Sequence, residues 1–150
     1  MLSELNDNPG AIAPLLEAAG LPSSACHCAA PRSLLGWRDG AALAAAGGLE
    51  RCGGDLLLRS LVVRPADRGR GIGARLVREL ERRAARDGFA SIYLLTLDAA
   101  DYFSRGFGYQ AVDRAAAPPG IRRSSQFTGT CPASAALLRK AISPAVNAGG

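Results

Sequence analysis

A glycine-rich segment near the middle of the chain has the composition of an anion-binding loop. Residues 64–74 contain Gly69, Gly71 and Gly73, two interleaved arginines, and the start of an amphipathic run. Glycine lets the backbone approach a ligand closely, and the free N–H groups at a helix start attract negative charge. The segment therefore predicts a phosphate or pyrophosphate site. The residues expected to hold this group are Arg68, Gly69, Arg70, Gly71, Ile72, Gly73 and Ala74.

Two nucleotide-binding motifs share glycines with this loop but fit it poorly. Gly69-x-Gly71-x-x-Ala74 matches the Rossmann fingerprint, whose glycines follow the strand directly, whereas here five residues separate Val63 from Gly69. A Walker loop requires Gly-Lys-Ser/Thr, and the only lysine, Lys140, is far away. Two alternatives stay open. The loop could anchor the phosphate of a nucleotide, or it could be a glycine-rich turn that binds no ligand.

The cysteines and the single histidine do not form a recognisable metal or nucleophile motif. Cys26 and Cys28 flank His27 with one intervening residue, whereas structural zinc sites space paired ligands by two to four. No G-x-S-x-G elbow is present to pair a serine with His27. We therefore expect no metal, and we interpret Cys52 and Cys131 as free thiols. Binding of a trivalent arsenical at Cys131 stays open as an alternative.

The strand before the loop, the loop and a segment downstream share a pattern with a known family. Its first part is Leu61-x-Val63-x-Pro65-x-x-Arg68-Gly69-x-Gly71-Ile72-Gly73, and its second part is Thr96-x-x-Ala99-x-x-Tyr102-Phe103 with Gly108-Tyr109. Together they resemble the GNAT-fold acetyl-CoA-dependent N-acetyltransferases, over residues 35–140. Shorter strings at residues 57–60, 93–96 and 121–135 resemble the arsenic-resistance-associated branch of that family.

The resemblance implies that acetyl-CoA is the co-substrate. In such folds the backbone of Leu61, Val62 and Val63 pairs with the pantetheine arm, and the amides of the glycine loop hold the pyrophosphate. Thr96 and Phe103 are further expected cofactor contacts. The implied reaction is direct attack by a neutral amine on the thioester, with a backbone N–H of the central strand stabilising the oxyanion.

The catalytic acid that the family uses is replaced in this sequence. Thr96 stands where the family often has asparagine, and Phe103 where it often has a tyrosine that protonates the departing thiolate. We consider Tyr102, one residue earlier, as the substitute acid. The alternative interpretation is that Tyr102 is an aromatic residue of the core. For the base, the resemblance favours Glu50, and a solvated glutamate at the strand end is the alternative.

Three residues are expected to face the acceptor: Arg59, Ser60 and Arg122. An arginine fork suits a carboxylate, phosphinate or arsinate, which favours an amino-acid-like or arsenical amine. Surface arginines are the alternative. A second functional hypothesis is a degenerate domain that binds acyl-CoA as a sensor or interaction module.

The elements that must position these residues follow from periodicity and turn signals. Helices are expected from Ala13 or Pro14 to Ala19 and over residues 71–87, 99–105 and 118–126, and strands over 33–38, 41–50, 56–63, 91–96, 110–114 and 134–140. This order predicts an α/β (α+β layered) fold. The resemblance makes it a mixed, mostly antiparallel central sheet flanked by helices, in one domain over residues 1–142 with a frayed tail at 143–150.

Composition narrows the class of protein. The 150 residues are 48% hydrophobic and carry a net charge of +5, and 17 of the 18 cationic residues are arginines. No run of about 18 apolar residues is present, and no signal peptide is visible, so we expect a cytoplasmic protein without a membrane partner. No nucleic-acid motif accompanies the basic charge. The expected partner is a small-molecule amine, and a homodimer is the oligomer that base rates favour.

Overall fold

The computed structural model describes residues 1–5, 9–18, 33–40, 42–96, 99–123 and 135–142, with Ser60 described by its backbone alone. The strands are β1 (Leu2–Glu4), β2 (Ser33–Asp39), β3 (Ala42–Cys52), β4 (Asp55–Val63), β5 (Ser91–Thr96), β6 (Gln110–Val112) and β7 (Ala136–Ala141). The helices are α1 (Ala13–Ala18), α2 (Ile72–Arg86), α3 (Ala100–Phe107) and α4 (Pro119–Arg122), with 3-10 turns at Pro9–Ile12, Pro65–Asp67 and Arg114–Ala116.

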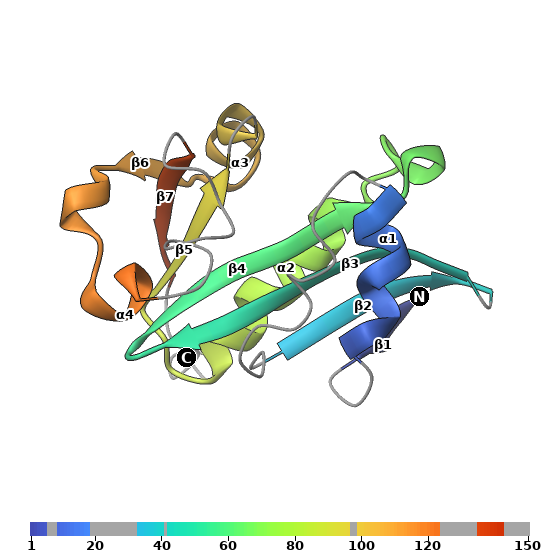
Figure 1. Ribbon diagram of the computed structural model, residues 1–150, viewed down its shortest axis with the longest axis horizontal. Helices are drawn as coiled ribbons and strands as arrows, with labels where there is room; N and C mark the ends of the chain where they lie inside the picture. Colours follow the sequence, from blue (N-terminus) through green and yellow to red (C-terminus); the bar gives the residue numbers. More distant parts are fainter. Residues whose placement is uncertain (6–8, 19–32, 41, 97–98, 124–134, 143–150) are drawn as a thin grey trace, which may run out of the picture. The chain divides into compact units, whose positions relative to one another are not determined.

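Hydrogen bonds join the strands in the order β1-β2-β3-β4-β5-β7-β6 (Figure 1). The pairs β1–β2, β2–β3, β5–β7 and β6–β7 are antiparallel. Residues 56–58 of β4 pair with residues 92–94 of β5 in parallel. The predicted mixed, mostly antiparallel sheet is therefore confirmed.

The chain forms two compact units, one of Met1–Glu50 with Arg59–Glu81 and one of Arg51–Leu58 with Arg82–Gly150. In the first unit, helices cover both faces of the sheet. The leucines of α1 share a buried cluster with Ala46 and Val62. An ideal Cβ on Gly47 would lie 3.0 Å from Leu61 Cδ1 and 3.4 Å from Leu80 Cδ1 of α2. Because neighbouring strand residues point to opposite faces, α1 and α2 lie on opposite sides of β3 (Figure 1).

In the second unit, β5 and β7 supply the centre of a small core. Cys52, Leu57, Tyr93, Ile121 and Leu137 belong to one buried cluster. A separate aromatic group connects α3 to the strand that follows it, through the rings of Tyr102, Phe103, Phe107 and Tyr109.

Most element boundaries agree with the sequence prediction within two residues, and the exceptions have local causes. The strand β1 was not predicted, because it has 3 residues and its order comes from pairing with Leu35, Gly36 and Trp37 of β2. The strand β6 ends at Val112, before Asp113, which caps the next 3-10 turn by accepting a 2.9 Å hydrogen bond from Ala115 N. The helix expected over residues 118–126 is observed at Pro119–Arg122, and its predicted end lies outside the described residues.

Among the helices of the described part of the chain, none combines the length and the apolar character needed to cross a membrane.

In the second unit, Gly120 of α4 lies close against the backbone at the end of β3. A Cβ on Gly120 would fall on the carbonyl oxygen of Cys52, 2.6 Å from the carbonyl carbon. We expect Gly120→Ala to lower the free energy of unfolding by about 1–3 kcal/mol, since backbone must move to admit the methyl group. Urea denaturation measures this loss.

Gly106→Ala is the matched control, because a Cβ there meets nothing within 4 Å in the interior of α3. It should stabilise the protein by roughly 0.5–1 kcal/mol. Equal destabilisation by both substitutions would contradict the crowding at Gly120.

Candidate functional site

The glycine loop, residues 64–74, connects the end of β4 to the start of α2. A 3-10 turn at Pro65–Asp67 follows the strand, and α2 begins at Ile72. Gly69 and Gly71 have φ angles of +82° and +79°. An ideal Cβ on either would meet nothing within 4 Å, so the left-handed backbone, and not crowding, requires glycine here.

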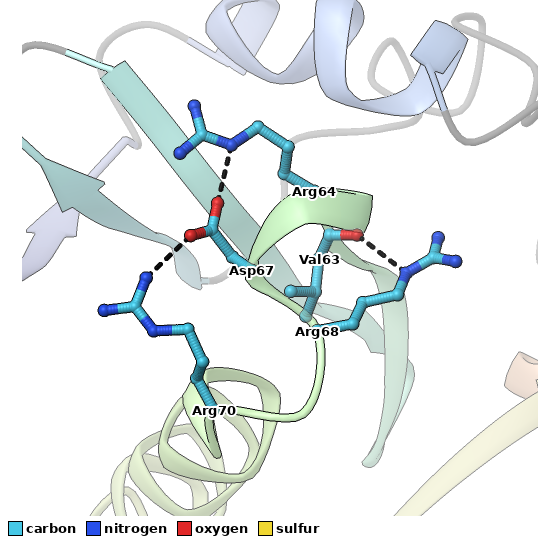
Figure 2. Close-up of polar contacts among 5 residues, drawn as sticks. All are labelled: Val63, Arg64, Asp67, Arg68 and Arg70. Carbon is cyan, nitrogen blue, oxygen red and sulfur yellow. Dashed lines mark hydrogen bonds and ion pairs between the residues drawn. The ribbon is translucent and has the colours of Figure 1, made fainter.

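A buried carboxylate organises the loop (Figure 2). Asp67 accepts a 2.6 Å hydrogen bond from Arg64 Nε at Oδ2 and a 2.8 Å hydrogen bond from Arg70 at Oδ1. The Asp67 side chain is 5% exposed, whereas that of Arg70 is 60% exposed. The hydrogen bond from Arg64 is the largest cause that lowers the pKa of Asp67, and burial opposes it. Asp67 is therefore an ionised anchor for two arginines.

Arg68 takes a different direction from Arg70. Its Nε donates a 3.2 Å hydrogen bond to the carbonyl oxygen of Val63, and its side chain is exposed (Figure 2). The loop carries three arginines and one carboxylate, so its net charge is +2. A guanidinium has several N–H donors, and one bond to the protein leaves others for an anion. The loop has the charge and the glycine backbone expected of a phosphate site.

Arg64 and Asp67 were missed as site residues by the sequence prediction, which chose the glycines and the arginines beside them. The signal was present as Arg64-x-x-Asp67-x-x-Arg70, because opposite charges three residues apart meet across a tight helical turn.

A buried ion pair lies on the same unit, across β3 and β4. Arg59 donates a 2.9 Å hydrogen bond from a terminal guanidinium nitrogen to Glu50 Oε1. The side chains are 4% exposed for Arg59 and 9% exposed for Glu50. The sequence prediction assigned these residues to separate tasks, acceptor binding and base catalysis. The structure brings them into direct contact.

The second unit holds the other expected cofactor and acid residues. Thr96 ends β5, and its Oγ1 accepts a 3.0 Å hydrogen bond from Ala99 N, just before α3. Phe103 is buried, with its ring 5.2 Å from that of Tyr102 and 5.6 Å from that of Tyr109. Tyr102 is 48% exposed, so it is not a core aromatic. Its exposed position is compatible with a phenol that donates a proton to a bound substrate.

Arg122, at the end of α4, is exposed and donates a hydrogen bond to the carbonyl oxygen of Ala115. Of Ser60, the structure describes only the backbone of β4. Leu61, Val62 and Val63 form the end of β4, as expected.

In the described part of the chain, no group of three or more histidine, cysteine or acidic side chains could hold a metal ion. Cys26, His27, Cys28 and Cys131 lie outside the described residues, and Cys52 is a buried free thiol.

Comparison with known proteins identifies the family. The model of the acetyltransferase (GNAT) family matches residues 7–109. The chain belongs to the GNAT family of acetyltransferases. Among curated proteins, no significant match was found.

Solved structures share the GNAT fold at low sequence identity. Rv2747 from Mycobacterium tuberculosis, in complex with CoA, is 14% identical with a TM-score of 0.72, over 95% of this chain and 99% of that chain. The ribosomal-protein-S18-alanine N-acetyltransferase from Escherichia coli is 17% identical with a TM-score of 0.71, over 95% and 94%. An aminoglycoside 6′-N-acetyltransferase complexed with coenzyme A is 20% identical with a TM-score of 0.69, over 96% and 98%.

We expect Asp67→Asn to weaken acetyl-CoA binding by up to about tenfold. The substitution removes the anchor of Arg64 and Arg70, and the loop loses its preorganisation. The substitution also raises the net charge of the loop from +2 to +3. Because Arg70 is exposed, salt screens the additional attraction of the loop for an anion. Calorimetry measures the dissociation constant, with the exposed Glu17→Gln as control. Tighter binding in Asp67→Asn would contradict the role of the anchor.

The same carboxylate should make stability depend on pH in the acid range. The pKa of Asp67 in the folded state lies below its ordinary value of 3.8, so the unfolded chain binds the proton first as the pH falls. The contribution of ionised Asp67 to stability is complete when the pH is above the ordinary pKa of 3.8, and it is lost as the pH falls through the pKa of the folded state. The difference in Tm between wild type and Asp67→Asn should therefore narrow below about pH 4. A constant difference from pH 6 to pH 2 would refute this expectation.

Proposed function

We propose that this protein transfers the acetyl group of acetyl-CoA to the amine of a small acceptor, by direct attack within a ternary complex. The observation that carries the proposal is the basic glycine loop at the start of α2, held by Asp67, in a chain of the GNAT acetyltransferase family. CoA in the structures of Rv2747 and the aminoglycoside acetyltransferase supports the choice of co-substrate.

The loop and the end of β4 divide the binding of acetyl-CoA between them. Backbone N–H groups at residues 69–74, with Arg68 and Arg70, hold the pyrophosphate at the start of α2. The backbone of residues 61–63 pairs with the pantetheine arm, and Thr96 and Phe103 are further contacts. The left-handed conformations of Gly69 and Gly71 in the loop support this division.

The chemistry needs one base and, at most, one acid. Glu50 accepts the proton that the acceptor nitrogen loses, so that the neutral amine attacks the thioester carbonyl. The carbon–sulfur bond breaks as the amide forms, and Tyr102 donates a proton to the departing thiolate. A thiol has an ordinary pKa near 8.5, which makes the thiolate a tolerable leaving group even with a weak acid.

The acceptor class follows from arginine chemistry. We propose an amino-acid-like or arsenical amine whose anionic group binds Arg122 and Ser60, in a cytoplasmic protein that confers resistance to a toxic metalloid or xenobiotic. The exposure of Arg122 supports this role. We further propose that residues 1–142 act as one domain and that the protein functions as a homodimer.

A degenerate acyl-CoA sensor is the second candidate function. It is favoured by Phe103, which occupies the usual position of the acid and is buried among aromatic rings. The two candidates differ in turnover, because only the enzyme releases CoA thiol when an amine is added.

The first test is calorimetric titration with acetyl-CoA, with NAD and ATP as controls, followed by an amine screen with thiol detection. We expect selective acetyl-CoA binding. If acetyl-CoA does not bind, the proposed function is wrong. If acetyl-CoA binds but no amine causes release of CoA thiol, the sensor is favoured.

For the base, we expect Glu50→Gln to lower kcat by about 10²–10⁴-fold while the dissociation constant of acetyl-CoA stays unchanged. Glutamine keeps the shape of the side chain but cannot accept the amine proton. Glu17→Gln, on the exposed end of α1, is the matched control and should leave kcat unchanged. Full turnover in Glu50→Gln would exclude this residue as the base.

A further inference from the structure

We propose that Arg59 is a positioning residue that acts on acetyl transfer through Glu50. The inference rests on the proposed function, in which Glu50 is the base. It replaces the expected contact between Arg59 and the acceptor with a contact inside the protein, the 2.9 Å hydrogen bond from the guanidinium to Glu50 Oε1.

Burial is the first argument. Only 4% of the Arg59 side chain is exposed, so it has little surface to offer an acceptor that arrives from solvent. Glu50 is also buried, with 9% of its side chain exposed. The guanidinium of Arg59 therefore has its observed partner inside the protein, at Glu50.

Charge is the second argument. A buried carboxylate is unfavourable unless an opposite charge and hydrogen bonds accompany it. The guanidinium of Arg59 supplies an opposite charge at hydrogen-bond distance, and the contact fixes the direction of the Glu50 carboxylate.

Strand geometry is the third argument. Glu50 lies near the end of β3, and Arg59 lies within β4, the neighbouring strand of the sheet. Both backbones are held by strand pairing. The carboxylate is therefore fixed by a rigid support and not by a mobile loop.

The test compares Arg59→Met, Arg59→Lys, Glu50→Gln and the double variant Arg59→Met/Glu50→Gln. Turnover is measured with acetyl-CoA and the amino acid that the wild-type chain acetylates fastest. We expect Arg59→Met to lower kcat by about tenfold or more, with both KM values within about twofold of wild type.

Two further readouts separate positioning from general damage. Arg59→Lys keeps the positive charge and should recover part of kcat, which a purely structural loss would not. In the Glu50→Gln background, Arg59→Met should cause no further loss of kcat, since its effect passes through the carboxylate. The double variant carries no buried charge at this pair, so it should fold even where Arg59→Met alone does not.

Three results would overturn the proposal: a raised KM for the acceptor with unchanged kcat, losses of kcat that are additive in the double variant, or equal kcat in Arg59→Met and Arg59→Lys. The first result would return Arg59 to acceptor binding. Failure of the proposed function is distinguishable from all three, because it would appear in the wild-type chain as absent acetyl-CoA binding or absent thiol release.

Discussion

Neutralisation of buried charge is the constraint around which the described site is organised. Three charged residues are buried in the described part of the chain: Glu50, Arg59 and Asp67. Each has an oppositely charged partner within 2.9 Å, and all three lie on β4, at the end of β3, or in the loop that follows β4. A buried charge is tolerated in a protein core when it is paired and hydrogen-bonded, so these contacts determine how the loop and the strand ends are held.

The two clusters use the same chemistry for different purposes. At Asp67, one buried carboxylate holds two arginines whose charged groups remain partly exposed, which leaves positive charge directed at solvent. At Glu50, one buried arginine holds a carboxylate that is slightly more exposed than itself. The first arrangement suits an anion such as pyrophosphate, and the second suits a proton acceptor. Arginine serves both because its planar group donates several hydrogen bonds and stays charged.

The aromatic group on α3 shows how a small helix can display a polar group without losing its packing. Tyr102 places its ring edge against Phe103 and Phe107, at centroid distances of 5.2 and 5.5 Å, although about half of its surface is exposed. Such edge-to-face contacts stabilise the ring and restrict its motion. A phenol held in this way is better defined than one on a flexible loop.

Local sequence determined the elements and the glycine loop. The apolar period of α2, the glycines at positions with left-handed backbone, and the strand runs around residues 56–63 and 91–96 are encoded within a few neighbouring residues, so they were predictable. The family pattern likewise depends on short spacings and is confirmed over residues 7–109. The tertiary structure alone decided the pairing of Arg59 with Glu50, the strand β1 and the exposure of Tyr102. These features depend on strand register and on packing between residues that are far apart in the sequence, and neither can be read from local sequence.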